Sequence, residues 1–162
     1  MGVHLYTNGA WTDSGRIYRN SLNRINADDF YLSFKQQDGT YQGTRSTIYL
    51  VRMKPFSQDD IGKTFTFSMM LSPNTNNVRV SANIGGQELN GTTNSQGLTK
   101  ITFLCASVED YLYFNWGSEG SVVQTLWNLM LNLGNTALTY EPYNVVDWYT
   151  NNGHGYSSGA WS

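Results

Sequence analysis

A regular alternation of apolar and polar residues runs through the second half of the chain. The odd positions of 65–71 are all apolar, the even positions of 78–84 are Val, Val, Ala and Ile, and similar patterns recur at 98–106 and 111–116. Because successive side chains of a strand point to opposite faces, each run predicts a strand with one buried face. The link at 72–77 is rich in Pro and Asn, which favour turns, so it predicts a hairpin of the first two strands.

The run 122–133 allows two interpretations, since its apolar residues could also form one face of a helix. Its odd positions alternate with Gln124, Asn128 and Asn132. Asn disfavours helix interiors, so the run predicts a strand. Trp127, in the middle of this strand, is predicted to lie in the core.

The first third of the chain is less regular. Residues 48–55 predict a strand that ends near a proline, and 17–18 and 30–34 predict two short strands. About eight short strands separated by Gly, Asn and Ser turns indicate an all-β fold, an antiparallel β-sandwich of jelly-roll type. We expect one domain over 1–150 and a flexible linker or tail at 151–162, which has no periodicity. The residues expected between the two sheets are Phe65, Phe67, Val78, Val80, Ile101, Phe103, Phe114, Leu129 and Leu131.

The charge composition narrows the classes of partner. The 162 residues include 10 Lys and Arg against 12 Asp and Glu, a net charge of −2, so no general attraction to nucleic acid or to an anionic membrane is expected. No run approaches the ~18 apolar residues of a membrane span, and the first residues lack the pattern of a secretory signal. A role outside the cell would therefore require transport within a larger chain or release on lysis.

Residues that commonly carry enzyme chemistry are few and far apart. Cys105 is the only cysteine and lies in an apolar run, which predicts a buried, inert thiol. The only histidines, His4 and His154, lie at opposite ends of the chain, a spacing that disfavours a zinc site. Most acids form adjacent pairs in turns, and neighbours on an extended chain point to opposite faces, so they do not make a glycosidase dyad. We expect a protein that is not an enzyme and that has no cofactor.

Four side chains of the first third carry the oxygen atoms that calcium prefers: Asn26, Asp28, Asp29 and Asp38. Their spacing is not that of a diagnostic calcium loop, and acids in turns are usually solvated surface residues. The sequence therefore predicts no metal site.

A candidate binding surface follows from the outward positions of two strands. Polar residues alternate with the apolar ones at 78–84, and tyrosines do so at 111–116. If the two strands share a sheet, aromatic rings, amides and a guanidinium gather on one face, as in a saccharide site. The alternative is that the tyrosines are ordinary strand formers and the arginine a solvated charge. The candidate residues are Arg79, Asn83, Tyr111, Tyr113, Asn115 and, from a turn-rich loop between two glycines, Trp11.

The stretch from Leu126 to Tyr143 carries a resemblance to a known family. It reads LWNLMLNLGNTALTYEPY, an apolar strand followed by a Gly, a small polar turn and Tyr-Glu-Pro-Tyr. This pattern resembles the closing strand and exit of carbohydrate-binding-module-like jelly rolls of bacteriophage tail proteins, and 64–84 is similar to their paired inner strands. The resemblance spans roughly 46–143. Many members carry a charged residue before the Gly of the closing turn, where this chain has Leu133.

The resemblance implies a non-catalytic carbohydrate-binding module of a phage tail adhesion device, such as an evolved distal tail protein or a receptor-binding protein. Such a module would act from the virion, outside the host cell, and bind a cell-wall polysaccharide of the bacterial host. Its neighbours would be other tail or baseplate domains, and it would need neither nucleic acid nor membrane insertion. The alternative is a structural or oligomerisation domain of a tail fibre or baseplate protein, with Tyr111 and Tyr113 buried between subunits.

Overall fold

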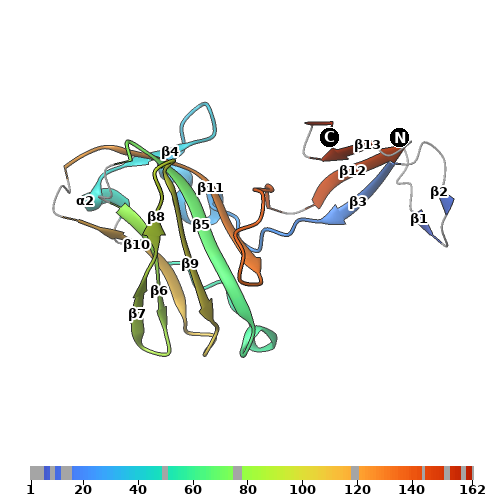
Figure 1. Ribbon diagram of the computed structural model, residues 1–162. Coiled ribbons are helices and arrows are strands. Elements are labelled where there is room, and N and C mark those ends of the chain that lie inside the picture. Colours follow the sequence, from blue (N-terminus) through green and yellow to red (C-terminus); the bar gives the residue numbers. More distant parts are fainter. Residues whose placement is uncertain are drawn as a thin grey trace.

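Two antiparallel sheets packed face to face form the body of the protein in the computed structural model (Figure 1). The larger sheet has the strand order β4 (Tyr41–Gly43), β11 (Gln124–Leu133), β5 (Thr64–Ser72), β9 (Leu98–Leu104) and β8 (Thr92–Thr93). The smaller sheet has the order β10 (Tyr111–Trp116), β6 (Val78–Ile84) and β7 (Gln87–Asn90). The predicted all-β sandwich is therefore confirmed.

The structure describes the chain with several gaps. The described residues are 6–7, 10–11, 16–48, 51–74, 78–117, 121–143, 145–151, 154–157 and 160–161, and their side chains are described between 21 and 143.

The core lies between the two sheets, as the alternation predicted. Phe67 of the central strand β5 is fully buried, and its ring stacks on that of Phe114 in β10 with the ring centroids 6.3 Å apart. Of the residues predicted to fill this space, Ile101 is half-buried and all the others are buried. Cys105 is a buried free thiol, as predicted.

The predicted hairpin of β5 and β6 is wrong, because the two strands belong to different sheets. β5 pairs with β11 and β9, whereas β6 pairs with β10 and β7. Each strand is apolar on one face, and face-to-face packing buries both apolar faces across a core about 10 Å thick. A connection as long as 73–77 is able to cross that distance.

Gly91 allows the chain to return from the smaller sheet to the larger one. It lies between β7 and β8, and its amide donates a hydrogen bond of 2.8 Å to the carbonyl oxygen of Val80. A Cβ atom at this position would lie 2.6 Å from the carbonyl oxygen of Lys100. Only glycine has the space for this close approach of backbones.

The strand predicted at 30–34 is wrong, because this segment is helical. It is divided between the short helix α1 (Asp28–Tyr31) and the 3-10 turn η1 (Leu32–Phe34). The side-chain oxygen of Asn26 accepts a hydrogen bond from the amide of Asp28, and two acids occupy the first turn. These helix-start signals outweigh the strand preference of the aromatic residues that follow.

The strand predicted at 48–55 is also wrong. The helix α2 (Arg45–Ile48) ends where that strand was predicted to begin, and Met53 pairs with Leu112 of β10 only through an isolated bridge. Pro55 has no amide hydrogen with which to extend a ladder. Residues 51–55 thus follow the edge of the smaller sheet without becoming a strand, and they lead into the 3-10 turn η2 (Gln58–Asp60). Residues 49 and 50 of the predicted strand lie outside the described part of the chain. Among the described residues, no helix has the length and apolar character needed to cross a membrane.

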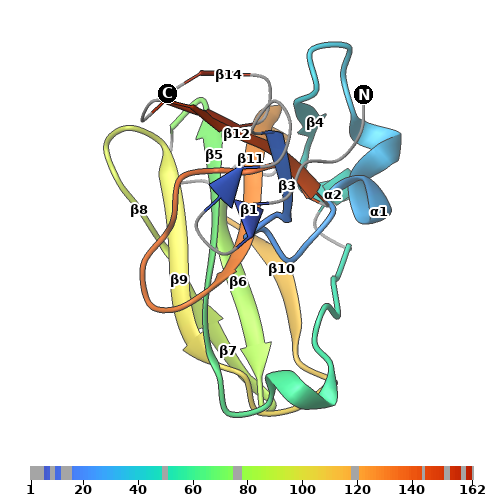
Figure 2. The ribbon, with the colours of Figure 1, turned by 90° about the vertical axis from the view of Figure 1, so that its right-hand side faces the viewer.

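The two ends of the chain form two further sheets, separate from the sandwich. β1 (Tyr6–Thr7) pairs with β2 (Ala10–Trp11), and a four-stranded sheet has the order β14 (Ala160–Trp161), β13 (His154–Ser157), β12 (Val145–Asn151) and β3 (Arg16–Asn20). This second sheet lies to one side of the sandwich in Figure 1 and toward the viewer in Figure 2. β3 confirms the short strand predicted at 17–18. The described part of 151–162 lies in β12, β13 and β14, and the division of the chain at residue 150 stays a prediction.

Candidate functional site

A β-bulge in β11 shapes the main candidate site. Trp127 of β11 pairs with Met70 of β5, and Met130 pairs with Ser68, so that Asn128 and Leu129 together oppose a single residue of β5. Asn128 has a φ of 55°, a backbone conformation that asparagine adopts more readily than most residues. A bulge of this kind reverses which side chains of the strand face the core.

The bulge corrects the prediction that Trp127 lies in the core. Before the bulge an even position, Leu126, belongs to the hydrophobic core, and after it the odd positions Leu129 and Leu131 do so. Trp127 is therefore half-buried and lines a surface cleft.

Asn23 joins the segments that form one side of this cleft. Its amide nitrogen donates hydrogen bonds to the carbonyl oxygens of Leu129 (2.9 Å) and Glu141 (3.0 Å). Its amide oxygen accepts hydrogen bonds from the backbone amides of Leu131 (3.1 Å) and Ile25 (3.2 Å). The side chain is buried, and its hydrogen-bonding groups are fully used to hold the chain around the bulge.

The cleft has a volume of about 480 Å³ and an amphipathic lining. Trp127, Tyr140 and Tyr143 contribute aromatic rings, and the two tyrosines are 39% and 41% exposed. The polar residues in its lining include Asn26, Asp28, Lys35, Asp38 and Asn128. Clefts of this size that combine aromatic surface with a few polar groups are typical of ligand-binding sites.

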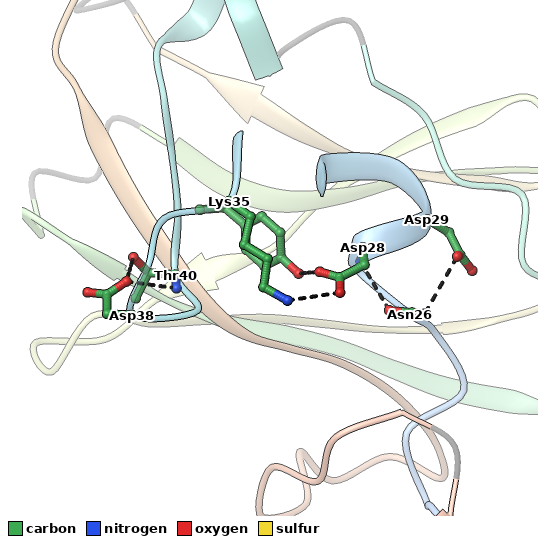
Figure 3. Close-up of polar contacts among 7 residues, drawn as sticks. Asn26, Asp28, Asp29, Lys35, Asp38 and Thr40 are labelled. Carbon is green, nitrogen blue, oxygen red and sulfur yellow. Dashed lines mark hydrogen bonds and ion pairs between the residues drawn. The ribbon is translucent and has the colours of Figure 1, made fainter. Parts of the chain in front are cut away.

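Asp28 connects three elements at the cleft wall (Figure 3). It accepts a hydrogen bond from the hydroxyl of Tyr41 and forms an ion pair of 2.9 Å with the ammonium of Lys35. Hydrogen bonds from Lys35 and from Tyr41 hold the pKa of the Asp28 carboxyl below its usual value. Burial, with a smaller contribution from the Asp28 charge, raises the pKa of the Tyr140 hydroxyl, and Tyr140 lines the same cleft as Asp28.

Asp38 presents a second carboxylate at the cleft. It lies in a tight turn in which Gly39 has a φ of 86°, and the amide and hydroxyl of Thr40 donate hydrogen bonds of 3.0 and 2.6 Å to the same oxygen, Oδ1. Figure 3 shows the second carboxylate oxygen directed away from Thr40. The hydroxyl and then the amide of Thr40 lower the pKa of the Asp38 carboxyl.

We expect Asp28 to make the stability of the fold depend more steeply on pH under acidic conditions. Its pKa is lower in the folded protein than in the unfolded chain, so its stabilisation is present above the unfolded value of 3.8 and is lost as the pH falls through the folded value. The melting temperature of Asp28→Asn should therefore fall less steeply than that of the parent as the pH drops below about 4. Parallel melting curves for the two proteins over this range would contradict this assignment.

The residues considered as calcium ligands do not converge on a metal site. Asp28 and Asp38 line the cleft, but the first is bound to Lys35 and Tyr41 and the second to Thr40. Asp29 accepts a hydrogen bond of 3.5 Å from the side-chain nitrogen of Asn26. This contact is one of the dashed lines in Figure 3. In the part of the chain that the structure describes, no three His, Cys, Asp or Glu side chains are placed to hold a metal ion.

The sequence-predicted surface lies on the smaller sheet, where the register brings most of its residues together. β10 pairs with β6, with Tyr111 opposite Asn83 and Asn115 opposite Arg79, and Tyr113 lies between them. The condition that the two strands share a sheet is therefore met. Trp11 belongs to β2, and its side chain lies outside the described part of the chain.

Several groups on this surface are already bonded to one another. The guanidinium of Arg52 lies 4.7 Å from the ring centroid of Tyr111, and the amide nitrogen of Asn115 donates hydrogen bonds to Glu88 (3.0 Å) and Asn90 (2.6 Å). Tyr111 also contacts Tyr113, with the ring centroids 5.6 Å apart. A ligand on this surface would have to replace some of these contacts.

The cleft was not among the sites predicted from the sequence. Trp127 was predicted to lie in the core, and the segment from Tyr140 to Tyr143 carried a family resemblance but no predicted site residue. One aromatic residue before the closing turn, Trp127, and two after it, Tyr140 and Tyr143, are a signal that could have indicated a site. Comparison with known proteins adds no assignment, because no protein family, curated protein or solved structure matches the chain.

Proposed function

We propose that the chain is a non-catalytic carbohydrate-binding domain and that the cleft at the bulge holds the saccharide. The observation that carries this proposal is the lining of the cleft, where Trp127, Tyr140 and Tyr143 surround the same space as Asn26 and Asn128. Sugars have apolar C–H faces and hydroxyl-rich edges. Aromatic rings can bury the first, and amides can form hydrogen bonds with the second.

The state of the two cleft carboxyl groups supports binding rather than hydrolysis. A glycosidase needs a general acid whose pKa is raised so that it keeps its proton. The pKa values of Asp28 and Asp38 are both shifted in the opposite direction. In addition, both oxygens of Asp28 accept hydrogen bonds from neighbouring side chains.

The setting that we propose is a phage tail adhesion device that binds a cell-wall saccharide of its bacterial host. This part of the proposal rests on the resemblance of 126–143 to phage tail modules. A single open cleft should bind weakly, with a Kd of roughly 10 µM to 1 mM, and many copies per virion would supply avidity.

The test is binding of purified wall polysaccharides and defined oligosaccharides to the parent and to two tyrosine variants. Tyr140→Ala should weaken binding by roughly 5- to 30-fold, because one stacking ring is lost. Tyr113→Ala is the matched control, since it removes a tyrosine from the other candidate surface and should change binding less than about twofold. Isothermal titration calorimetry would supply the affinities, and melting temperatures would confirm that both variants fold.

The possible results separate the alternatives. If Tyr113→Ala and Arg79→Ala weaken binding while Tyr140→Ala does not, the saccharide lies on the smaller sheet. If the parent binds no saccharide of the panel, the proposed function is wrong. A stable trimer with Tyr111 and Tyr113 protected in the interface would favour the structural role in a tail fibre or baseplate.

A further inference from the structure

We infer that the cleft selects saccharides that carry a positively charged amino group. This inference rests on the proposed function, and it assigns the chemical class of the ligand. It follows from the charges that line the cleft and from their position among aromatic rings.

The cleft contains more negative than positive charge. Of its charged residues, Asp28 and Asp38 are acidic and Lys35 is basic. The ammonium of Lys35 lies 2.9 Å from Asp28, so these two charges offset each other within the wall. The carboxylate of Asp38 is exposed, and among the described residues the ion pairs that involve a cleft residue do not include it; it accepts hydrogen bonds from the neutral amide and hydroxyl of Thr40. A ligand therefore meets one negative charge that has no cationic partner among the described residues.

Asp38 is positioned to receive a hydrogen-bond donor from the ligand. Thr40 occupies Oδ1 through two hydrogen bonds, which fixes the carboxylate in the turn. Oδ2 points away from Thr40 (Figure 3). An ammonium group donates three hydrogen bonds and carries the complementary charge, whereas an N-acetyl group is neutral and offers a single N–H.

The aromatic rings of the cleft favour the same class of ligand. The faces of Trp and Tyr rings attract cations, and aromatic rings combined with a carboxylate form a recurring site for ammonium groups. Trp127, Tyr140 and Tyr143 line the same cavity as Asp38. Neutral sugars could still stack on these rings, but they would gain nothing from the charge. Anionic sugars would be repelled by it.

The test compares four oligosaccharides of equal length: glucosamine, N-acetylglucosamine, glucose and galacturonic acid oligomers. At about pH 6 and low salt, the glucosamine oligomer should bind at least about fivefold more tightly than the two neutral oligomers, and the galacturonic acid oligomer should bind most weakly. Raising the salt from about 50 to about 500 mM should reduce the preference for glucosamine and leave neutral binding nearly unchanged.

Asp38→Asn supplies the decisive variant, because asparagine keeps the acceptor oxygen for Thr40 and removes the charge. It should abolish the preference for the glucosamine oligomer while neutral oligomers bind within about twofold of the parent. Asp59→Asn removes an exposed aspartate outside the cleft and serves as the control. Equal affinity for charged and neutral oligomers in the parent overturns the inference, as does a preference that survives in Asp38→Asn. Both results leave the proposed function intact if binding still depends on Tyr140, whereas failure to bind any oligomer overturns both proposals.

Discussion

Replacing Asn23 with alanine should lower the free energy of unfolding by about 3 to 5 kcal/mol. The side chain is 3% exposed and hydrogen-bonds the carbonyl oxygens of Leu129 and Glu141 and the amides of Ile25 and Leu131. Alanine would leave these four backbone groups without this partner, and each buried group left unsatisfied costs about 1 to 3 kcal/mol. Partial access of water accounts for a total below the simple sum.

Urea unfolding followed by circular dichroism would measure this loss. Asn135→Ala is the control, because Asn135 is an exposed asparagine that accepts one long hydrogen bond, 3.3 Å, from Thr136. It should change stability by less than about 0.5 kcal/mol. Asn23→Asp should also be strongly destabilising, because a carboxylate would face the carbonyl oxygens of Leu129 and Glu141. A loss of less than about 1 kcal/mol in Asn23→Ala would mean that the segments around the bulge hold together without this side chain.

Phe67→Ala should cost about 3 to 5 kcal/mol of stability, the usual range for a fully buried phenylalanine. Phe67 lies in the central strand β5, has no exposed surface and stacks on Phe114 across the core. Removal of the ring deletes this contact and leaves a cavity that paired strands on both sides cannot close. The midpoint of chemical denaturation should fall accordingly, with little change in the denaturant dependence.

Leu104→Ala is the comparison for this prediction. Leu104 lies in the neighbouring strand β9 and is 57% exposed, so its truncation should cost less than about 0.5 kcal/mol. If Phe67→Ala were as mild as Leu104→Ala, the assignment of Phe67 to the space between the sheets would be wrong.

The alternation of side chains was sufficient to predict most strands of the sandwich. β9, β10 and β11 lie within the predicted runs, and the apolar face of each is largely buried. Periodicity describes one strand at a time, however. It does not indicate which strand pairs with which. For this reason β5 and β6 were predicted as a hairpin, although they lie in opposite sheets.

The candidate surface on the smaller sheet could also be predicted from the alternation of side chains. The cleft could not. Tyr111, Asn83 and their neighbours share a face because of strand parity, which can be read from spacing. The cleft depends on the reversal of parity at Asn128 and on chain segments more than 80 residues apart, such as Asp38 and Trp127. A bulge needs only one additional residue, and nothing in the alternation of 122–133 distinguishes it from a regular strand.

Two segments of the chain cover the outer edge of β11, and this cover affects the tendency of the protein to aggregate at high concentration. β4 pairs only with Gln124, Thr125 and Leu126, and beyond that point the amide of Arg24 and the side chain of Asn23 engage the backbone of Leu131. Without this cover, an uncharged and largely apolar strand would expose free amides and carbonyls. Such an edge is a template for intermolecular pairing, and strands of this composition are prone to form fibrils. The short segment before α1 therefore protects the protein against aggregation, a property that would matter wherever many copies are held close together.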